Sequence, residues 1–333
     1  MGRSGLTLAA GWAAAGWALA LIAAPAMAQS GPGPIAVHGN KQTFEIAPVL
    51  LAADEFYPDV ATVKMGGIPN LVGEAIVPGF GEEGVADVAT HAETQALRYS
   101  MRHPDLRIVI NVAEGLYRIV ARRSAGIERV ADLKGKRVAT IAQTSSGYFL
   151  HRMLAREGLS FDDIVAMPIA PLSGMTEALR KGEVDAVVIW EPESENSAQV
   201  LGDDLVEFHG DGVYRELFNL NTTAANLADP VKRAKIVRFV RAVIDATAEL
   251  NEDPARARRL VVEAGGFSAD DVEDSWKHHR FNARPMPDLL EVLVLEEQWL
   301  ASRDSRPARS REQLAALIDT SVYQEALLLD TRP

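Results

Sequence analysis

The stretch Gln143-Thr144-Ser145-Ser146-Gly147 places three hydroxyl groups between a β-like run and a helical repeat. A helix that begins at about Ser146 leaves its first N–H groups unpaired and turns the positive end of its dipole toward this loop. The three hydroxyls, beside an unobstructed Gly147, suit the binding of a sulfonate, carboxylate or carbonyl oxygen. The same residue types cap the N-termini of helices in many proteins, so a cap and a ligand contact both stay open.

Other polar and aromatic residues follow predicted strands or begin predicted helices. His91 lies in a strand-end loop, where it could contact a ligand, but an isolated histidine is no catalytic constellation. Ser173 begins a helix and is either a cap or a ligand contact. Trp190 ends a strand and either packs in the core or stacks on a ligand. Ligands of open parallel sheets bind beyond the carboxyl ends of the strands, so these loops form the candidate site.

The reactive groups of the chain form no catalytic motif. The sequence has no G-x-S-x-G elbow, no G-x-x-x-x-G-K-[ST] loop, no H-E-x-x-H and no G-x-G-x-x-G that opens a helix after a strand. His278 and His279 are adjacent, which predicts different faces of a helix and a surface or interface position rather than a metal site. We therefore expect a protein that is not an enzyme and that uses no cofactor and no metal.

The composition is that of a soluble globular protein with a negative surface. The 333 residues are 47% apolar and 24% charged, which is enough chain for two lobes with substantial cores. The net charge of -12 opposes binding to nucleic acid or to an anionic membrane, because phosphates would meet a field of like sign. The chain contains no cysteine, so its core rather than disulfide bonds must hold the fold, and no N-terminal cysteine can carry a lipid.

The N-terminus has the pattern of a secretion signal. Arg3 precedes an apolar stretch that runs from Leu6 to about Ala24, and Ala26-Met27-Ala28 follows as a small-residue cleavage site before Gln29. The alternative is a membrane anchor, because the stretch is nearly long enough to span a bilayer. Export with cleavage predicts a freely diffusing protein of the periplasm.

Short β-branched runs alternate with helical periods through the first two thirds of the chain. We expect strands at 42–47, 60–64, 85–90, 106–112, 117–122, 137–142, 164–169, 185–190, 205–208 and 217–222, with helices at 91–102, 146–157 and 173–181 among them. This alternation predicts parallel sheets covered on both faces. From Asp229 onward amphipathic helices predominate. The phrase Gly-x-x-Asp before an apolar strand occurs at Gly84 and again at Gly182, which favours two similar lobes.

Two longer phrases resemble the periplasmic solute-binding proteins of ABC importers, in the branch for aliphatic sulfonates, taurine, nitrate and thiamine-pyrimidine precursors. They are VADLKGKRVATIAQTSSGYFLHRMLAREGL and MTEALRKGEVDAVVIWEPE. In that family a D-L-K-G-K segment leads into a strand, a G-T/S-S loop and a helix, and a G-x-x-D-A strand ends in W-E-P. The phrases ADVATHAETQAL and PMPDLLEVLVLEEQWL are also similar, so the resemblance covers most of the chain after the leader.

The resemblance implies an α/β fold, a two-lobed periplasmic binding protein of type II, with two parallel-type mixed sheets, two crossing strands and a helical C-terminal tail. The implied division is a signal peptide at 1–28, a linker at 29–34, one lobe made of 35–116 and 221–333, and a second lobe at 117–220. The crossings are expected near 114–118 and 218–222. The ligand contacts that follow, together with Thr144 from the loop chemistry, are Pro48, Thr90, His91, Ser145, Ser146, Ser173, Trp190 and Glu191.

The resemblance also implies a function, the capture of a small organic solute in a cleft that closes by hinge motion. The solute is expected to be sulfonate-like or heteroaromatic, and the partner is an ABC permease in the inner membrane, with the binding protein itself a monomer. Two alternatives stay open. One is a ligand-sensing partner of a membrane receptor. The other is a pyrimidine-synthesising enzyme on the same scaffold, which the absence of cysteine disfavours.

Overall fold

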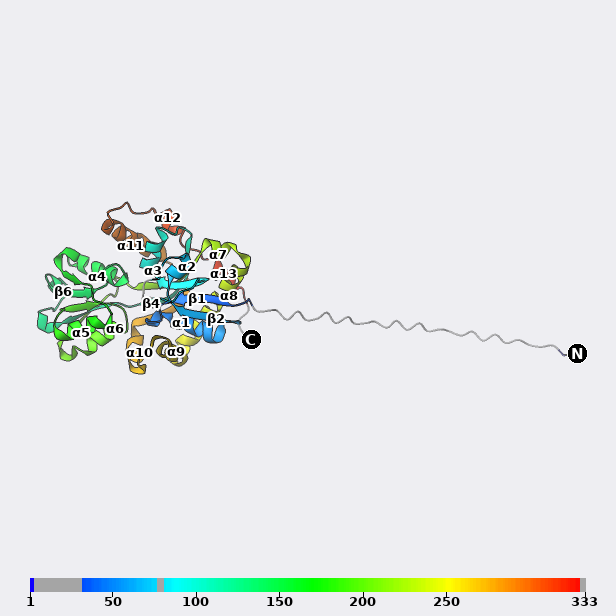
Figure 1. Cartoon of the computed structure of the whole chain (residues 1–333), viewed down its shortest axis with the longest axis horizontal. Helices are drawn as coiled ribbons and strands as arrows, with labels where there is room; N and C mark the ends of the chain where they lie inside the picture. The colour runs from blue at the N-terminus through cyan, green and yellow to red at the C-terminus, as the bar shows by residue number, and fades with distance from the viewer. Residues whose placement is uncertain (3–31, 77–80, 330–333) are drawn as a thin grey trace. The chain divides into compact units, whose positions relative to one another are not determined.

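The computed structural model describes residues 1–2, 32–76 and 81–329 (Figure 1). Internal contacts divide the chain into Met1–Ser30 and Gly31–Pro333, and every described helix and strand belongs to the second unit. The predicted leader at 1–28 therefore lies, apart from its first two residues, outside the described part. Within that part, none of the helices combines the length and the hydropathy that a membrane span requires.

The described strands form two mixed sheets, in agreement with the predicted α/β class. The first sheet has the order β11-β4-β10-β3-β1-β2, and the second has the order β7-β6-β8-β5-β9. The first sheet consists of β1 (Ile35–Gly39), β2 (Ala61–Met65), β3 (Val88–Ala92), β4 (Leu106–Gly115), β10 (Glu216–Thr223) and β11 (His279–Arg284). The second consists of β5 (Arg118–Arg122), β6 (Arg137–Thr140), β7 (Val165–Met167), β8 (Ala186–Val188) and β9 (Leu205–His209).

Helices cover both faces of both sheets. They are α1 (Ala47–Leu51), α2 (Ile68–Val72), α3 (Glu93–Ser100), α4 (Ser145–Arg156), α5 (Ser173–Lys181), α6 (Glu193–Gln199), α7 (Ala224–Ala228), α8 (Pro230–Glu252), α9 (Ala255–Gly265), α10 (Ala269–Ser275), α11 (Leu289–Arg303), α12 (Arg311–Ala315) and α13 (Ser321–Leu327). Figure 1 shows α4, α5 and α6 gathered with β6 in green, while the blue, yellow and red helices surround the first sheet. The adjacent residues Ile119 and Val120 of β5 point into different apolar clusters, one under α4 and one under α5, as the alternation of a strand requires.

Most predicted strands occur close to the expected positions, with one error and two omissions. The run predicted as a strand at 42–47 begins helical structure instead, because Phe44–Ile46 form a 3-10 turn and α1 starts at Ala47 with Pro48 in its first turn. The first strand of the chain is β1, which lies just upstream. The edge strand β11 was missed because its exposed side chains are long and polar and its apolar positions are few.

The repeated Gly-x-x-Asp phrase corresponds to the same local structure in both sheets. The Asp87 N–H donates to the Ala36 carbonyl at 2.8 Å, and the Ala36 N–H donates back to the Asp87 carboxylate at 3.0 Å. Asp185 and Arg137 exchange the equivalent two bonds in the second sheet, each at 2.8 Å. Each aspartate thus fixes the start of a neighbouring parallel strand, so the repeated phrase has the same local role in both sheets.

The chain passes from the first sheet to the second and back through short connections. It leaves β4 at Gly115 and enters β5 at Arg118, as expected. It leaves β9 at His209 and enters β10 at Glu216. The crossing expected near 218–222 is displaced, because those residues pair with β3 and β4 inside the first sheet.

Gly147, the last residue of the QTSSG phrase, lets α4 approach the loop before it. A Cβ at this position would lie 2.5 Å from the Ala142 carbonyl oxygen and 2.7 Å from the Ala142 Cα. Backbone atoms cannot move aside as a flexible side chain does, so the close approach requires glycine. This contact fixes the N-terminus of α4 against the end of β6.

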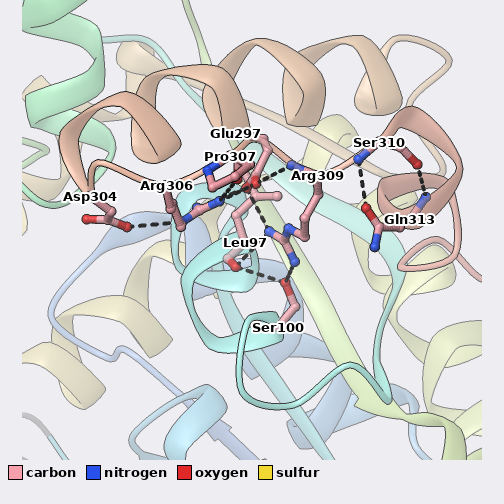
Figure 2. A network of polar contacts seen from close by, with 9 residues as sticks. All are labelled: Leu97, Ser100, Glu297, Asp304, Arg306, Pro307, Arg309, Ser310 and Gln313. Atoms are coloured by element: carbon pink, nitrogen blue, oxygen red, sulfur yellow. Dashed lines mark hydrogen bonds and ion pairs between the residues drawn. The ribbon is translucent and has the colours of Figure 1, made fainter.

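The segment after α11 is held on α3 by one buried carboxylate, Glu297 (Figure 2). Arg306 donates to Glu297 at 2.6 Å, and Arg309 donates to it through both its guanidinium and its backbone N–H at 2.9 Å. Arg309 also reaches the Ser100 hydroxyl and the Leu97 carbonyl of α3. Burial raises the pKa of Glu297, but the bonds from the two arginines outweigh burial and lower that pKa to about 2.

We expect Glu297→Gln to lower the free energy of unfolding by about 2–4 kcal/mol at neutral pH, because both arginines lose a buried partner. The folded pKa lies below the ordinary value of 4.5, so the stabilisation is complete above pH 4.5 and is lost as the pH falls toward 2. Urea unfolding of both proteins at several pH values measures this difference. The matched control is Glu291→Gln, whose partner Arg311 is exposed and whose effect should stay below about 1 kcal/mol. Equal losses in the two variants would contradict the assignment.

Candidate functional site

The carboxyl ends of the parallel strands in both sheets meet around one small cavity. Strands β1 and β3 end there in the first sheet, and β6 and β8 end there in the second. Strand β10 runs antiparallel to β3 and β4, so its first residue, Glu216, lies at the same edge. The cavity has a volume of about 60 Å³, which is room for a few water molecules. Its lining residues are Asn40, Thr43, His91, Ala92, Gln95, Thr144, Ser145, Trp190, Glu216 and Phe218.

Four of the residues predicted as ligand contacts line this cavity together. They are His91, Thr144, Ser145 and Trp190, and they come from both sheets. Glu191 lies beside them, in a smaller hollow that also contains Trp190.

The other predicted contacts lie elsewhere. Pro48 is buried in the first turn of α1, Thr90 is buried in β3, and Ser146 is buried in the first turn of α4. Ser173 begins α5 and is exposed. None of these four residues belongs to the lining of the cavity.

Within the QTSSG phrase, the three hydroxyls have different partners. Thr144 donates to the Ile141 carbonyl at 2.8 Å and lies 2.9 Å from the Ser146 hydroxyl, so both of these groups are used inside the loop. Ser145 instead reaches across to the first sheet, where it donates to the Glu216 carboxyl at 3.2 Å. The Thr144 side chain makes no capping bond to α4. Ser145 therefore joins the two sheets at the cavity, a role that neither the cap nor the ligand hypothesis had included.

Glu216 belongs to a buried acidic pair. Its carboxyl is 5% exposed, and the Tyr117 hydroxyl lies 3.4 Å from one of its oxygens. Burial and the negative charges of Glu45 and Glu93 raise the pKa of Glu216 well above its ordinary value. Its hydrogen-bonded neighbour Glu45 behaves in the opposite way. Burial raises the pKa of Glu45, but His279, at 3.4 Å, outweighs burial and holds it below the ordinary value.

The pKa values of the two carboxyls are shifted in opposite directions. Burial lowers the pKa of His279 but Glu45 raises it above its ordinary value, so Glu45 and His279 each favour the charged form of the other. The raised pKa of Glu216 favours its protonated form, because like charges repel strongly in a dry site. The adjacent positions His278 and His279, expected on a helix, lie in a 3-10 turn and in β11, and His278 lies 3.5 Å from Glu195.

A second acidic pair lies further from the cavity. Tyr214 donates to Glu93, and the backbone N–H of Leu217 donates to the same carboxyl at 2.8 Å. Burial, and then the charge of Glu93, raises the pKa of Glu296 well above its ordinary value. Burial also raises the pKa of Glu93. The start of β10 is thus held between two pairs of buried carboxyls.

His91 lines the cavity as a neutral imidazole. Burial, helped by the positive charge of Arg98, lowers the pKa of His91 to about 4. Its Nδ1 accepts a bond from the Ala92 N–H at 3.2 Å, so the Nε2 carries the hydrogen. The ring can donate one hydrogen bond but contributes no charge.

Trp190 is placed at the cavity by a buried arginine. Arg118 has no exposed surface and forms ion pairs with Glu191, with Glu195 at 2.7 Å and with Glu207 at 2.6 Å. Glu191 follows Trp190 directly, so the pair with Arg118 fixes the turn that presents the indole. Both Glu191 oxygens are used in the protein, since the second accepts the Glu195 N–H at 3.0 Å.

Comparison with known proteins identifies the family. The family model described as NMT1/THI5 like matches residues 63–257, which is more than half of the chain. The chain belongs to the NMT1/THI5-like family. A protein of Escherichia coli (strain K12), provisionally named an aliphatic sulfonates-binding protein, is 39% identical over 185 residues. That match covers 54% of this chain and 55% of the relative, so the chain spans about half the length of the curated relative it matches.

Solved structures share the fold of this NMT1/THI5-like protein. The alkanesulfonate-binding protein SsuA from Xanthomonas axonopodis pv. citri, bound to MOPS, has a TM-score of 0.63 at 19% identity and covers 87% of this chain and 99% of its own. The periplasmic aliphatic sulphonate binding protein SsuA from Escherichia coli has a TM-score of 0.64 at 18% identity, over 84% and 91% of the two chains. A mutant of the enzyme DszB in complex with biphenyl-2-sulfinic acid has a TM-score of 0.60 at 14% identity, over 89% and 99%. The predicted two-lobed binding-protein fold is therefore confirmed.

Sequence reasoning missed several lining residues of this NMT1/THI5-like site. Asn40 and Thr43 follow β1, and they would have been found had the first strand been placed at 35–39 rather than at 42–47. Glu216 and Phe218 lie at the start of a strand, where the rule for parallel sheets does not look. These two residues reach the cavity because β10 runs antiparallel to its neighbours, and no pattern in the sequence indicates the direction of a strand.

We expect Glu216→Gln to gain stability over the wild type as the pH rises, because glutamine keeps the shape of a protonated carboxyl without its proton equilibrium. The folded pKa of Glu216 is raised above 4.5, so the wild type is penalised progressively above pH 4.5 as its unfolded chain ionises. Thermal unfolding of both proteins from pH 4.5 to about pH 8 measures the growing difference. Glu297→Gln is the opposing control, because it should be less stable than the wild type at neutral pH. A difference for Glu216→Gln that stays constant with pH would contradict the buried proton.

Proposed function

We propose that this protein is the periplasmic substrate-binding component of an ABC importer, and that it captures a small organic solute between its two sheets. The observation that carries the proposal is the cavity whose lining comes from both sheets at the carboxyl ends of their parallel strands. Membership of the NMT1/THI5-like family and the fold of sulfonate-binding neighbours support it. The names of those relatives favour a sulfonate-like or heteroaromatic solute.

The two lobes in this proposal are the part built on the first sheet, residues 35–115 with 216 onward, and the part built on the second sheet, residues 118–209. The expected boundary at 220 moves to 216 because β10 pairs with β3 and β4 in the first sheet. Ligand binding closes the lobes on each other, and the short connections at 115–118 and 209–216 act as hinges. Hydrogen bonds between the lobes at the rim of the cavity are present in this structure, and we expect them to break when the lobes open. Gln95 and Arg98 of α3 both donate to the Gln143 carbonyl, at 3.2 and 3.1 Å.

The remaining parts of the proposal concern location and partner. The leader at 1–28 directs export and is removed, so that the mature protein begins at Gln29 and diffuses as a monomer in the periplasm. Its partner is an inner-membrane permease that recognises the closed form. The residues proposed to contact the solute are those at the cavity, His91, Thr144, Ser145 and Trp190, with Glu216 added.

The chemistry of the cavity favours binding over catalysis. Ser145 donates to a carboxyl group rather than to an imidazole, and burial with the charges of Glu45 and Glu93 raises the pKa of that carboxyl well above its ordinary value, which favours its protonated form over the basic one. The neutral His91 ring uses its Nδ1 to accept a bond from the Ala92 N–H, so that this nitrogen does not orient a catalytic partner. These groups can recognise a ligand without reacting with it.

Native mass spectrometry of the protein purified from its own periplasm tests the proposal. A small molecule retained at one copy per chain, and a smaller radius of gyration in X-ray scattering when that molecule is added back, are the expected results. The same spectrum reports whether the chain begins at Gln29. A protein that carries no small molecule, and whose scattering is unchanged by concentrated periplasmic extract, would overturn the proposed function.

We expect Ser145→Ala to weaken binding of the retained solute by about 1–3 kcal/mol, because Ser145 both lines the cavity and orients Glu216. The matched control is Ser146→Ala, since Ser146 is fully buried and bonded only to Thr140, Thr144 and Ile141. Isothermal titration of both variants measures the difference. Equal losses of affinity in Ser145→Ala and Ser146→Ala would indicate that the QTSSG hydroxyls have only a structural role.

A further inference from the structure

The lining of the cavity contains a carboxyl group but neither lysine nor arginine. Its polar members are neutral amides, hydroxyls and the neutral His91, together with Glu216. The cations nearest in sequence are already paired elsewhere. Lys41 lies 3.7 Å from Glu82, and Arg98 is bonded to Gln95 and to the Gln143 carbonyl. The lining itself therefore offers a ligand no cationic side chain, and the charge of Arg98 acts on it from outside the lining, through its effect on the pKa of His91.

Two aromatic rings complete the lining. Phe218 and Trp190 face the cavity from the first and the second sheet. Phe218 also belongs to an apolar cluster of the first sheet, and the half-buried Trp190 packs against both clusters of the second sheet. Among the described aromatic rings, neither forms a ring-to-ring pair. Aromatic faces attract cations, and indole does so most strongly.

We infer that the solute is an organic cation, an ammonium or protonated nitrogen heterocycle, whose charge docks on Glu216 and whose body lies against Trp190 and Phe218. This inference rests on the proposed function and chooses among its solute classes. It favours a nitrogen compound over a sulfonate. The carboxylate supplies the charge partner, and the two rings supply the apolar and cation–π contacts.

An anionic solute fits the same cavity poorly. The attractions for it are the positive end of α4, through the N–H groups that begin at Ser145, and the charge of Arg98 outside the lining. The Glu216 carboxyl already lies at that point, bonded to Ser145, and Glu45 and Glu93 add their negative charges. A sulfonate placed there would have to share a buried site with three carboxyl groups.

The surroundings of Glu216 also explain why the empty site favours a protonated Glu216. The groups that face it are Glu45, Glu93, Tyr117 and Ser145, and His279 reaches it through Glu45. Without a solute, the proton on Glu216 keeps a further negative charge out of this group of carboxyls. When a cation enters, that proton passes to solvent and the cation takes its place, so binding at neutral pH releases a proton.

The test uses three probes that share one skeleton: benzylammonium, neutral benzyl alcohol and phenylmethanesulfonate. Calorimetric titration of the purified, ligand-free protein at neutral pH, in two buffers of different ionisation enthalpy, gives both the affinity and the number of protons released. We expect benzylammonium to bind at least about tenfold more tightly than phenylmethanesulfonate, a difference of about 1.4 kcal/mol. Close to one proton should be released with benzylammonium and none with benzyl alcohol.

Two variants assign the effect to Glu216. Glu216→Gln should lose about tenfold or more in affinity for benzylammonium and should release no proton, while its affinity for benzyl alcohol should fall by much less, because the alcohol carries no charge. The control is Glu193→Gln, which removes another buried carboxyl that is bonded to Thr176 and lies outside the cavity lining. It should leave all three affinities unchanged.

The possible failures are distinguishable from failure of the proposed function. Tighter binding of the sulfonate, equal binding of benzylammonium to Glu216→Gln, or no binding of benzylammonium at all would each overturn the inference. If native mass spectrometry still finds a retained small molecule, the proposed function stands and the solute is an anion or a neutral compound. If it finds none and scattering detects no closure, the proposed function itself fails.

Discussion

A guanidinium without exposed surface imposes the strongest constraint on this molecule. Arg118 enters the second sheet directly after the crossing from the first, and a buried positive charge is tolerated only with ionised, hydrogen-bonded partners. Those partners are Glu191 in the turn after β8, Glu195 in α6 and Glu207 in β9. Their positions, and hence that of Trp190, follow from the need to neutralise one arginine. Glu195 also lies near Lys277 and His278, so the same cluster reaches the first sheet.

The first sheet has the opposite charge imbalance at the cavity, where several carboxyl groups are buried close together. Glu45 has His279 as its partner, which holds its pKa down, whereas burial and neighbouring carboxyls raise the pKa values of Glu216 and Glu296 well above the ordinary value. The raised pKa values favour the protonated forms, which limit the negative charge buried at this edge. The fold is shared with sulfonate-binding proteins at identities below a fifth. Ligand class must therefore be read from the lining residues rather than from the fold.

Residues far from the cavity serve a different purpose. Glu297 fastens the segment after α11 to α3 through Arg306 and Arg309 (Figure 2). Helix α3 begins at Glu93 and carries Gln95 to the rim of the cavity. A clamp in the C-terminal tail thus stabilises the helix that bounds the cavity, which explains why the fold retains a fully buried ionised carboxylate there.

The sequence by itself determined the alternation of strands and helices, the repeated Gly-x-x-Asp start of a strand in each sheet, and the strand ends and helix start that carry His91, Thr144, Ser145 and Trp190. These features depend on local periodicity and on turn chemistry, both of which act over a few residues. Three features depend on the tertiary structure alone. They are the hydrogen bond of the Ser145 hydroxyl to the first sheet, the ion pair of Glu191 with Arg118, and the position of Glu216 in the cavity lining. Each of these depends on partners about 70 to 100 residues apart in the chain, whose meeting is set by strand direction and burial. The shifted pKa values of the buried carboxyls also depend on the tertiary structure, because these groups lose contact with water only when the sheets have packed.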